Sequence, residues 1–478
     1  MRPLGTGPGQ AIIVVGLGFG DEAKGATVDH LAWRIPHTTA VVRWSGGVQA
    51  AHNVVHGPRH HTFRQFGSAT LLGVPTLLRA PMMVDPLGLS VEAEELRGLG
   101  VAAPLNLITA DPRCLVTTPF HAAMNRAREE SRGTGVHGAC GMGVGETVAF
   151  ALAAAGLDAG NLPLAGVGPG APVLRVGDLR DRAATIRGLD ALARAAATLT
   201  EDLPAVGAVA EAMCDLAGDL RIADDMDAVL ARRLEAGTVI FEGSQGVLLD
   251  EFAGFHPHTT WATLNPRARA NASGGAADSQ DVTGLPRPHL GLADQLERAG
   301  HRPYVLGLTR SYSTRHGAGP LPTEDPAQRF PEPHNGVTYQ GAWRQGPLDL
   351  DLLHYAARAV GVDGVGVSHL DAPVRVVSPS WSGPESRLRD VQSLSGQDLE
   401  MVRDANAAAA TRAHPEYDRV QGRDDVISRI EEATGAPVVL VADGPTRTDR
   451  SIRWSPRASS ASSPSTSWPA ATTATHAR

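Results

Sequence analysis

The residues with the clearest chemical potential follow an apolar run near the start of the 478-residue chain. Ile12 to Val15 is a run of four β-branched residues, which is typical of a strand buried on both faces. Three glycines in the next five residues let the backbone turn sharply, and we expect a helix to begin near Glu22. The free amide groups at that helix N-terminus, together with the ammonium group of Lys24, are suited to hold phosphate.

Asp21 is the unusual residue of this stretch, because an anion stands where phosphate is expected. The carboxylate fits if it holds Mg²⁺ against the phosphates, or if it removes a proton from a substrate beside them. A dinucleotide fingerprint needs a glycine at position 21, so that interpretation fails. An ordinary P-loop is a near miss, because Gly18 is followed by Ala23-Lys24-Gly25. A glycine-rich turn without function is the remaining alternative.

A parallel sheet would bring further polar residues to this loop. Thr39 to Trp44 predicts a second strand, which ends in a loop that contains Gln49, His52 and Asn53. Loops at the carboxyl ends of neighbouring parallel strands face the same crevice, so we expect His52 and Asp21 to converge. A histidine in such a loop is also common as a surface or packing residue.

Later segments repeat the pattern of a strand followed by a polar loop. After their strands, Gln245 could present an amide, and Asp371 could accept two N–H bonds from a ligand such as a guanine edge. A helix cap or turn role for Asp371 is the alternative. The further strands that we predict are Leu105 to Thr109, Val239 to Phe241, Tyr304 to Leu308, the residues before Ser368 and Val438 to Val441.

Other stretches indicate how the chain is divided. Residues 1–10 predict a flexible lead, and residues 455–478, rich in Ser, Ala, Thr and Pro, predict a disordered tail. Between them we expect one domain, 11–454, with a helical insertion at about 146–235. Six glycines in residues 132–145 predict a mobile loop that closes over a ligand. Residues 313–324 predict a long loop, for which an ordinary surface connection is the alternative.

Composition excludes several classes of protein. The 43 basic and 51 acidic residues give a formal charge of -8, so we expect no nucleic-acid partner. The three cysteines have no metal-ligand spacing and fit a reducing compartment better than a disulfide framework. We find no secretory signal and no run long enough to span a membrane, and therefore expect a soluble cytoplasmic protein without a membrane partner.

In order along the chain, these segments resemble the adenylosuccinate synthetase family over about residues 12–450. Residues 20–25, GDEAKG, are similar to the family's GDEGKG; residues 241–246, FEGSQG, to its FEGAQG; and residues 314–320, TRHGAGP, to its TRVGAGP. The resemblance implies an α/β fold with a large central, mostly parallel sheet and flanking helices, a P-loop-NTPase-like GTP-dependent ligase fold. It also implies a homodimer that uses GTP as co-substrate and Mg²⁺.

The resemblance assigns a role to each motif residue. The family joins IMP to aspartate: Asp21 would deprotonate N1 of IMP and bind Mg²⁺, His52 would help move the γ-phosphoryl group to O6, and Gln245 would support the purine. The implied substrate-binding residues are Glu22, Lys24, Gln49, Cys140, Thr260, Thr338 and Arg344. The implied GTP-binding residues are Gly20, Lys24, Gly25, Asn53, His369, Asp371, Ala442 and Gly444. The implied metal ligands are Asp21 and the backbone carbonyl of Ala51.

The residues expected around the IMP phosphate and those expected to bind aspartate both depart from the family pattern. Around the IMP phosphate, the family's Asn, Thr and Arg become Gln49, Cys140 and Ala154, and only Thr260 is kept. That arginine comes from a partner subunit in the family. The family's TTG and arginine run become residues 338–344, TYQGAWR, and the lysine of its KLD becomes His369.

These departures leave three hypotheses for the reaction. The chain is a divergent adenylosuccinate synthetase whose substrate contacts come from shifted residues such as Arg344. Alternatively, it is a paralogue that uses the same GTP-driven amination on a different acceptor or with a different amine. The third hypothesis is a non-catalytic nucleotide-binding protein, against which the intact Asp21, His52 and Gln245 argue.

Overall fold

The computed structural model describes residues 7–157, 162, 164–267, 291–333, 339–383, 387–391, 394 and 396–453. Its centre is a ten-stranded sheet in which only the strand at one edge is antiparallel to its neighbour. This sheet and its flanking helices confirm the predicted α/β fold class. In spatial order the strands are β18 (Arg450–Ile452), β17 (Val438–Ala442), β12 (Gly364–Ser368), β9 (Tyr304–Arg310), β1 (Ala11–Gly16), β8 (Thr238–Gly246), β2 (Thr38–Arg43), β5 (Thr76–Leu78), β6 (Ile108–Ala110) and β7 (Arg221–Ile222).

Strand β1 lies between β8 and β9, and all of its residues are buried. Its alternate residues belong to two different hydrophobic clusters. Ile12 and Val14 share one cluster with helix α1 (Lys24–Arg34), whereas Ile13 shares the other with helix α9 (Leu350–Val360). The β-branched run therefore fills both faces of the sheet, as its composition predicts.

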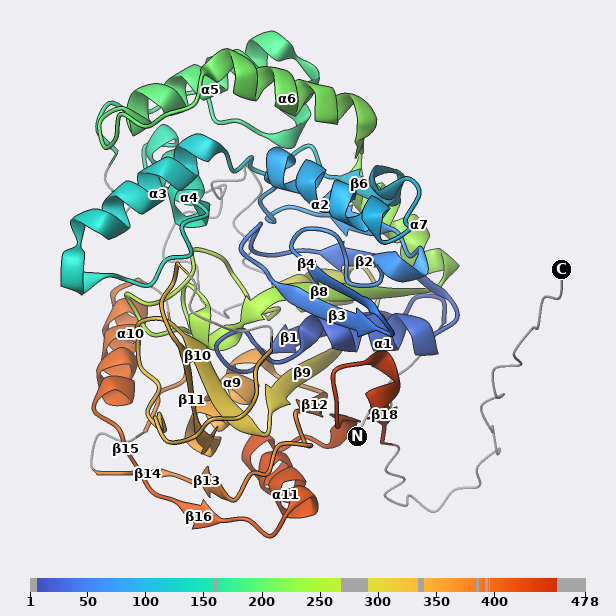
Figure 1. Cartoon of the computed structure of the whole chain (residues 1–478), viewed down its shortest axis with the longest axis vertical. Coiled ribbons are helices and arrows are strands. Elements are labelled where there is room, and N and C mark those ends of the chain that lie inside the picture. The colour runs from blue at the N-terminus through green and yellow to red at the C-terminus, as the bar shows by residue number, and fades with distance from the viewer. Residues whose placement is uncertain are drawn as a thin grey trace, which may run out of the picture.

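Helices cover both faces of the sheet and one end of the molecule (Figure 1). At that end, α5 and α6 lie side by side beyond α3 and α4 and share a separate core with α2. Among the described residues, no helix is long and apolar enough to cross a membrane. The remaining helices are α2 (Pro86–Gly98), α3 (Pro119–Ser131), α4 (Val144–Ala154), α5 (Arg182–Ala196), α6 (Val206–Asp219), α7 (Met226–Ala236), α8 (Leu292–Arg298), α10 (Gly396–Thr411) and α11 (Arg423–Thr434).

Three smaller sheets accompany the main one. The largest has the order β10-β11-β13-β16, and its β10–β11 pair lies beside the carboxyl ends of the central strands (Figure 1). The bounds are β3 (His52–His56) and β4 (Arg59–Phe63) for a hairpin, β14 (Trp381–Ser382) and β15 (His414–Pro415) for a second two-stranded antiparallel sheet, and β10 (Tyr312–His316), β11 (Trp343–Asp349), β13 (Val376–Ser378) and β16 (Asp418–Arg419) for the four-stranded sheet.

Three local predictions were wrong. The strand expected at Leu105 to Thr109 is mostly a 3₁₀ turn, Pro104–Leu107, because the fixed φ of the proline favours the start of a helical turn; β6 begins only at Ile108. His52 was expected in a loop but is the first residue of β3, where it pairs with Phe63. The loop expected at 313–324 begins as strand β10, which pairs with β11 far along the chain.

The C-terminal part of the described chain closes onto α1. The guanidinium group of Arg447 donates to both carboxylate oxygens of Asp29, at 2.8 and 2.6 Å, and both side chains are buried. His30 also contacts the Arg447 carbonyl at 2.7 Å. We propose the division into 1–10, 11–454 and 455–478 as before; residues 1–6 and 454–478 lie outside the described part.

Candidate active site

The turn after β1 is held closed by Glu22 and Lys24. The Glu22 carboxylate accepts from the Gly20 N–H at 2.8 Å, and the Lys24 ammonium lies 3.1 Å from its other oxygen. Lys24 also donates to the Gly20 carbonyl at 2.6 Å. A Cβ at Gly16 or Gly18 would come within 2.0 or 2.6 Å of this carboxylate, so the glycines make room for it. The predicted phosphate-binding lysine is thus positioned by Glu22 and the loop backbone.

Ala23 links this turn to α1 in a left-handed conformation, with φ 61° and ψ 37°. This conformation costs an L-residue with a Cβ about 1–2 kcal/mol relative to glycine. The motif that the loop resembles has glycine at this position. Ala23 therefore adopts a conformation that favours glycine, although it carries a methyl group.

Asp21 lies at the mouth of the turn, with its side chain 26 % exposed. Burial raises the pKa of its carboxyl group, and the nearby His316 and Arg310 oppose that rise. Nε2 of His316 lies 3.9 Å from Asp21 Oδ2, and Arg310 donates to the Asp21 backbone carbonyl at 2.5 Å. A raised pKa makes the carboxylate a stronger base, as proton removal requires.

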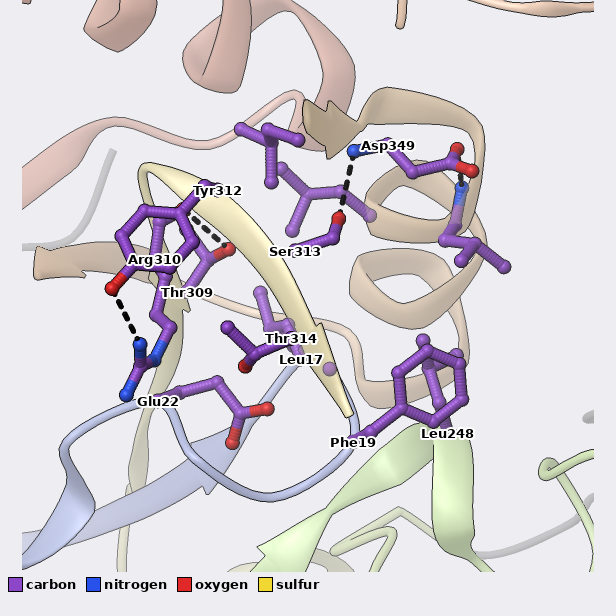
Figure 2. A pocket seen from close by; sticks show the side chains of 14 residues that line it. Leu17, Phe19, Glu22, Leu248, Thr309, Arg310, Tyr312, Ser313, Thr314 and Asp349 are labelled. Carbon is purple, nitrogen blue, oxygen red and sulfur yellow. Dashed lines mark hydrogen bonds between the residues drawn. The ribbon is translucent and has the colours of Figure 1, made fainter. Parts of the chain in front are cut away.

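Arg310 is in turn held by a buried polar group. It pairs with Glu332 and donates to the Tyr312 hydroxyl at 2.9 Å, and its guanidinium lies 5.3 Å from the ring centre of Trp343. Figure 2 shows the adjoining cavity, with Glu22 and Arg310 at one end and Phe19 at the other. The cavity lies beside the loop, and none of the three predicted catalytic residues lines it.

His52 is buried between β3 and β8, and both of its ring nitrogens face acceptors. Nδ1 lies 2.5 Å from Glu242 Oε1, and Nε2 lies 2.9 Å from the Ser244 carbonyl. Glu242 also accepts from the N–H and hydroxyl of Ser68. Although burial opposes ionisation, His52 and Arg43 hold the pKa of Glu242 at about 2. Burial lowers the pKa of His52, and the ionised Glu242 opposes that shift.

Gln245 meets another predicted residue, because Gln49 donates to its side-chain oxygen at 3.2 Å. The next residue, Gly246, packs directly on the phosphate loop: a Cβ there would lie 2.1 Å from the Gly18 carbonyl and 2.7 Å from the Gly20 nitrogen. The structure therefore brings the carboxyl end of β8 against the loop after β1.

Gly25 and Asn53 support the same region through packing and hydrogen bonds. A Cβ at Gly25 would lie 2.7 Å from the Cβ of His52, so this glycine allows α1 to approach β3. The Asn53 side chain accepts from His60 and Thr62, each at 2.8 Å, across the β3–β4 hairpin. Ala51, the predicted backbone metal ligand, is exposed immediately before β3.

The residues predicted to bind guanine gather at the ends of two neighbouring strands, β12 and β17. The Leu370 N–H donates to the Ala442 carbonyl at 3.1 Å, and Asp371 is exposed just beyond. Gly444 leaves space for Asp449, whose oxygen would lie 2.7 Å from a Cβ there. Burial lowers the pKa of His369 to about 3, so this residue is neutral where the family has lysine.

Of the predicted acceptor and amine residues, Cys140 and Thr260 lie on loops, and Arg344 lies in β11. Cys140 is half-buried in the glycine-rich loop, and the Thr260 N–H donates to the Leu249 carbonyl at 2.9 Å. Arg344 donates to the carbonyls of residues 317 and 319, at 2.8 and 2.9 Å, and lies 2.6 Å from Glu324. Thr338 lies outside the described residues.

The potential metal ligands are few. Within the described residues, no group of three or more His, Cys, Asp or Glu side chains could hold a metal ion. Magnesium in nucleotide sites takes one or two protein carboxylates and completes its shell with phosphate and water. The partly exposed Asp21 beside the phosphate loop fits that donor set.

Comparison with known proteins places this geometry in a family. The adenylosuccinate synthetase family model matches residues 13–287 and 293–377. The chain belongs to the adenylosuccinate synthetase family. It is therefore a GTP-dependent ligase of purine biosynthesis that acts on small molecules.

Individual relatives are similar over most of their length. An adenylosuccinate synthetase of Neisseria meningitidis is 28% identical over 465 residues, which cover 91% of this chain and 96% of that protein. A Burkholderia pseudomallei adenylosuccinate synthetase is 27% identical, with 92% and 95% covered. The solved structure of the fully ligated Plasmodium falciparum adenylosuccinate synthetase aligns with a TM-score of 0.69 at 17% identity, over 93% of this chain and 99% of that one. This structural match shows the shared fold.

Sequence reasoning missed several residues that shape the candidate site of this family member. Glu242 stands inside the FEGSQG motif, and its place directly after an apolar strand is a signal that it is buried with a partner. Arg310 and Glu332 gave no signal, because their pairing depends on a loop that returns to β9.

Proposed function

We propose that this enzyme uses GTP to phosphorylate a purine carbonyl oxygen and then replaces the phosphate with an amine. IMP and L-aspartate are the reference pair, which would give adenylosuccinate on the route to AMP. One observation carries the proposal: Asp21, His52 and Gln245 come from separate parts of the chain, and the segments that contain them pack on one another. Gly246 contacts Gly20, and His52 contacts Ser244.

The chemistry follows from the poor leaving ability of a carbonyl oxygen. Asp21, whose pKa is raised, takes the ring N–H proton, and the resulting oxyanion attacks the γ-phosphorus of GTP with loss of GDP. The amine then attacks the ring carbon, and inorganic phosphate leaves. The net result exchanges a C–O bond for a C–N bond at the cost of one phosphoanhydride bond.

His52 would contribute positive charge to the phosphoryl transfer. When its two contacts hold, both ring nitrogens donate, which requires the imidazolium form. The ionised Glu242 supports that form from one side, and burial opposes it. A cation fixed beside a transferring phosphoryl group stabilises its transition state.

Three further parts of the proposal come from the family. Mg²⁺ would bind Asp21 and the Ala51 carbonyl and would neutralise phosphate charge. The enzyme would act in the cytoplasm as a homodimer. The cytoplasmic location and the homodimer are separate from the chemistry, which does not depend on them.

The test is a steady-state assay with GTP, IMP and L-aspartate that follows adenylosuccinate and phosphate. Asp21→Asn should lose at least about 10²-fold in kcat, because the base is removed. Asp424→Asn, which removes an exposed carboxylate on α11, is the matched control and should retain activity. Full activity of Asp21→Asn would contradict the mechanism. Nucleotide binding without turnover of any carbonyl substrate would support a non-catalytic protein.

A different acceptor or amine donor is the second candidate, and the region of Arg344 favours it. Arginine is the natural bidentate partner of a carboxylate, but Arg344 is bound to Glu324 and to two backbone carbonyls. Trp343 stands where the resemblance expects another arginine, and its ring lies 4.6 Å from that of His316. GTP cleavage that requires another carbonyl substrate or amine, without adenylosuccinate formation, would support this candidate.

A further inference from the structure

His316 and Trp343 lie directly opposite each other on the antiparallel strands β10 and β11. Their ring centres are 4.6 Å apart and their planes are inclined by 61°, which is an edge-to-face contact. Residues that face each other across two antiparallel strands stabilise the pairing, and aromatic rings favour this edge-to-face arrangement. The pairing of the two strands therefore fixes the indole ring against the imidazole ring.

Both residues differ from the family pattern that the chain resembles. His316 stands where the family's TRVGAGP has valine, and Trp343 stands where another arginine is expected. Valine has no ring, so the contact exists only because this chain carries a histidine on one strand and a tryptophan opposite it. The two departures from the family pattern therefore form one structural unit, which we call the His316–Trp343 pair.

The imidazole end of the pair reaches the carboxylate of Asp21. Nε2 of His316 lies 3.9 Å from Asp21 Oδ2, and the two side chains are 16 % and 26 % exposed. This distance is longer than a hydrogen bond, but contacts of this kind in active sites often shorten when the substrate binds. The imidazole therefore limits the positions that the carboxylate can take on one side of the loop.

The indole end of the pair supports Arg310. The guanidinium of Arg310 lies 5.3 Å from the ring centre of Trp343, within the range of a cation–π contact. Its Nε donates to the backbone carbonyl of Asp21 at 2.5 Å. The side chain of Arg310 is 6 % exposed and pairs with Glu332, so its orientation is fixed. Trp343 thus packs on two residues that contact Asp21, one at its carboxylate and one at its backbone.

We propose that Trp343 is a positioning residue for the general base Asp21. It acts through His316, which holds the carboxylate, and through Arg310, which holds the backbone from which the carboxylate projects. The proposal rests on the proposed function, in which Asp21 removes the ring N–H proton of the acceptor. The base must lie within hydrogen-bond reach of that proton, and misplacement of a reacting group by about 1 Å can cost about 10²-fold in rate.

Kinetics with GTP, IMP and L-aspartate test the proposal, because a misplaced base lowers kcat rather than substrate affinity. Trp343→Ala should lower kcat about ten- to a hundredfold, while the KM values change by less than about threefold. Trp343→Phe keeps an aromatic ring opposite His316 and should retain at least about a third of the wild-type kcat. Trp33→Ala, which removes an exposed tryptophan near the end of α1, is the control and should leave kcat unchanged.

Two further measurements separate positioning from a general loss of structure. The losses in kcat caused by His316→Val and by Trp343→Ala should not multiply in the double variant, since the indole acts partly through the imidazole. A crystal structure of Trp343→Ala should show Asp21 displaced or in more than one position, with the phosphate loop otherwise intact. Multiplied losses, or an unmoved Asp21, would overturn the proposal.

The outcomes for the proposal and for the proposed function can be told apart. If the wild type forms adenylosuccinate and a folded Trp343→Ala keeps the wild-type kcat, the positioning role is wrong and the proposed function stands. A rise only in the KM for aspartate would also overturn the positioning role, since it would assign the pair to the amine donor. If the wild type forms no adenylosuccinate, the proposed function with this substrate pair fails, and the position of Asp21 in the crystal structure still tests the positioning role. If Trp343→Ala does not fold, an unchanged kcat in His316→Val overturns the proposal.

Discussion

Nδ1 of His52 lies 2.5 Å from Oε1 of Glu242, and both side chains are buried. The pair joins β3 to the central strand β8, so the position of the histidine depends on the main sheet. Ser68 completes the arrangement by donating twice to the same carboxylate. These contacts hold the His52 ring in one orientation, with Nε2 directed toward the Ser244 carbonyl, next to Gln245.

Glu242→Gln should lower kcat about 10²-fold while changing the affinity for GTP by less than threefold. The amide keeps the shape but removes the charge that favours a proton on His52, and loss of one such electrostatic stabilisation of a transition state costs about 10²–10³-fold. Steady-state kinetics and nucleotide titration measure the two quantities. Glu95→Gln, which removes an exposed partner of Arg64, is the control. An unchanged kcat in a folded Glu242→Gln variant would rule out this role of the pair.

Lowering the pH should reduce the unfolding free energy of the protein through Glu242. The pKa of Glu242 falls from 4.5 to about 2 in the folded protein, so its contribution is present above pH 4.5 and is lost as the pH falls toward 2. The shift corresponds to about 3 kcal/mol. In urea unfolding, the difference in unfolding free energy between wild type and Glu242→Gln should shrink between pH 5 and pH 2. A constant difference over that range would show that Glu242 is protonated in the native state.

Ala23→Gly should stabilise the protein. Glycine adopts the left-handed conformation of this position without the steric cost, although it also gains freedom in the unfolded chain. The net gain should be roughly 0.5–1 kcal/mol in unfolding free energy. Ala32→Gly, within α1, is the opposite control and should lose about 1 kcal/mol or more. A destabilised Ala23→Gly would mean that the methyl group makes favourable contacts that outweigh the strain.

Glu324→Gln should improve the use of aspartate if aspartate is the amine donor. Arg344 lies 2.6 Å from Glu324, and loss of that charge leaves its guanidinium available to a substrate carboxylate. We expect KM for aspartate to fall about three- to tenfold with kcat nearly unchanged. Asp418→Asn, which breaks the exposed pair with Arg429, should have no effect. An unaltered KM would favour a donor that does not use Arg344.

The sequence predicted correctly those parts of the fold that depend on the pattern of a few neighbouring residues. The run Ile12 to Val15 and the turn before α1 formed as expected, because a two-faced apolar strand and a glycine turn are specified within a few residues. Pro104 shows the limit: apolar content favoured a strand, whereas the proline began a 3₁₀ turn.

The site was less predictable, because its contacts join distant segments. That Glu22 would pair with Lys24 inside the loop depends on space left by two glycines. The engagement of Arg344 depends on β10 and β11 pairing across a long connection. The contact of Glu129 with the Gly138 N–H gave no sequence signal, since a glutamate near a helix end is ordinary.

The Asp29–Arg447 pair has a consequence for synthesis of the protein. Asp29 lies on the helix that carries the phosphate loop, and its partner emerges from the ribosome 418 residues later. A buried carboxylate without its partner is strongly unfavourable. Until nearly the whole chain has been made, Asp29 lacks this partner, so the docked position of α1 is less stable in the nascent polypeptide than in the finished protein.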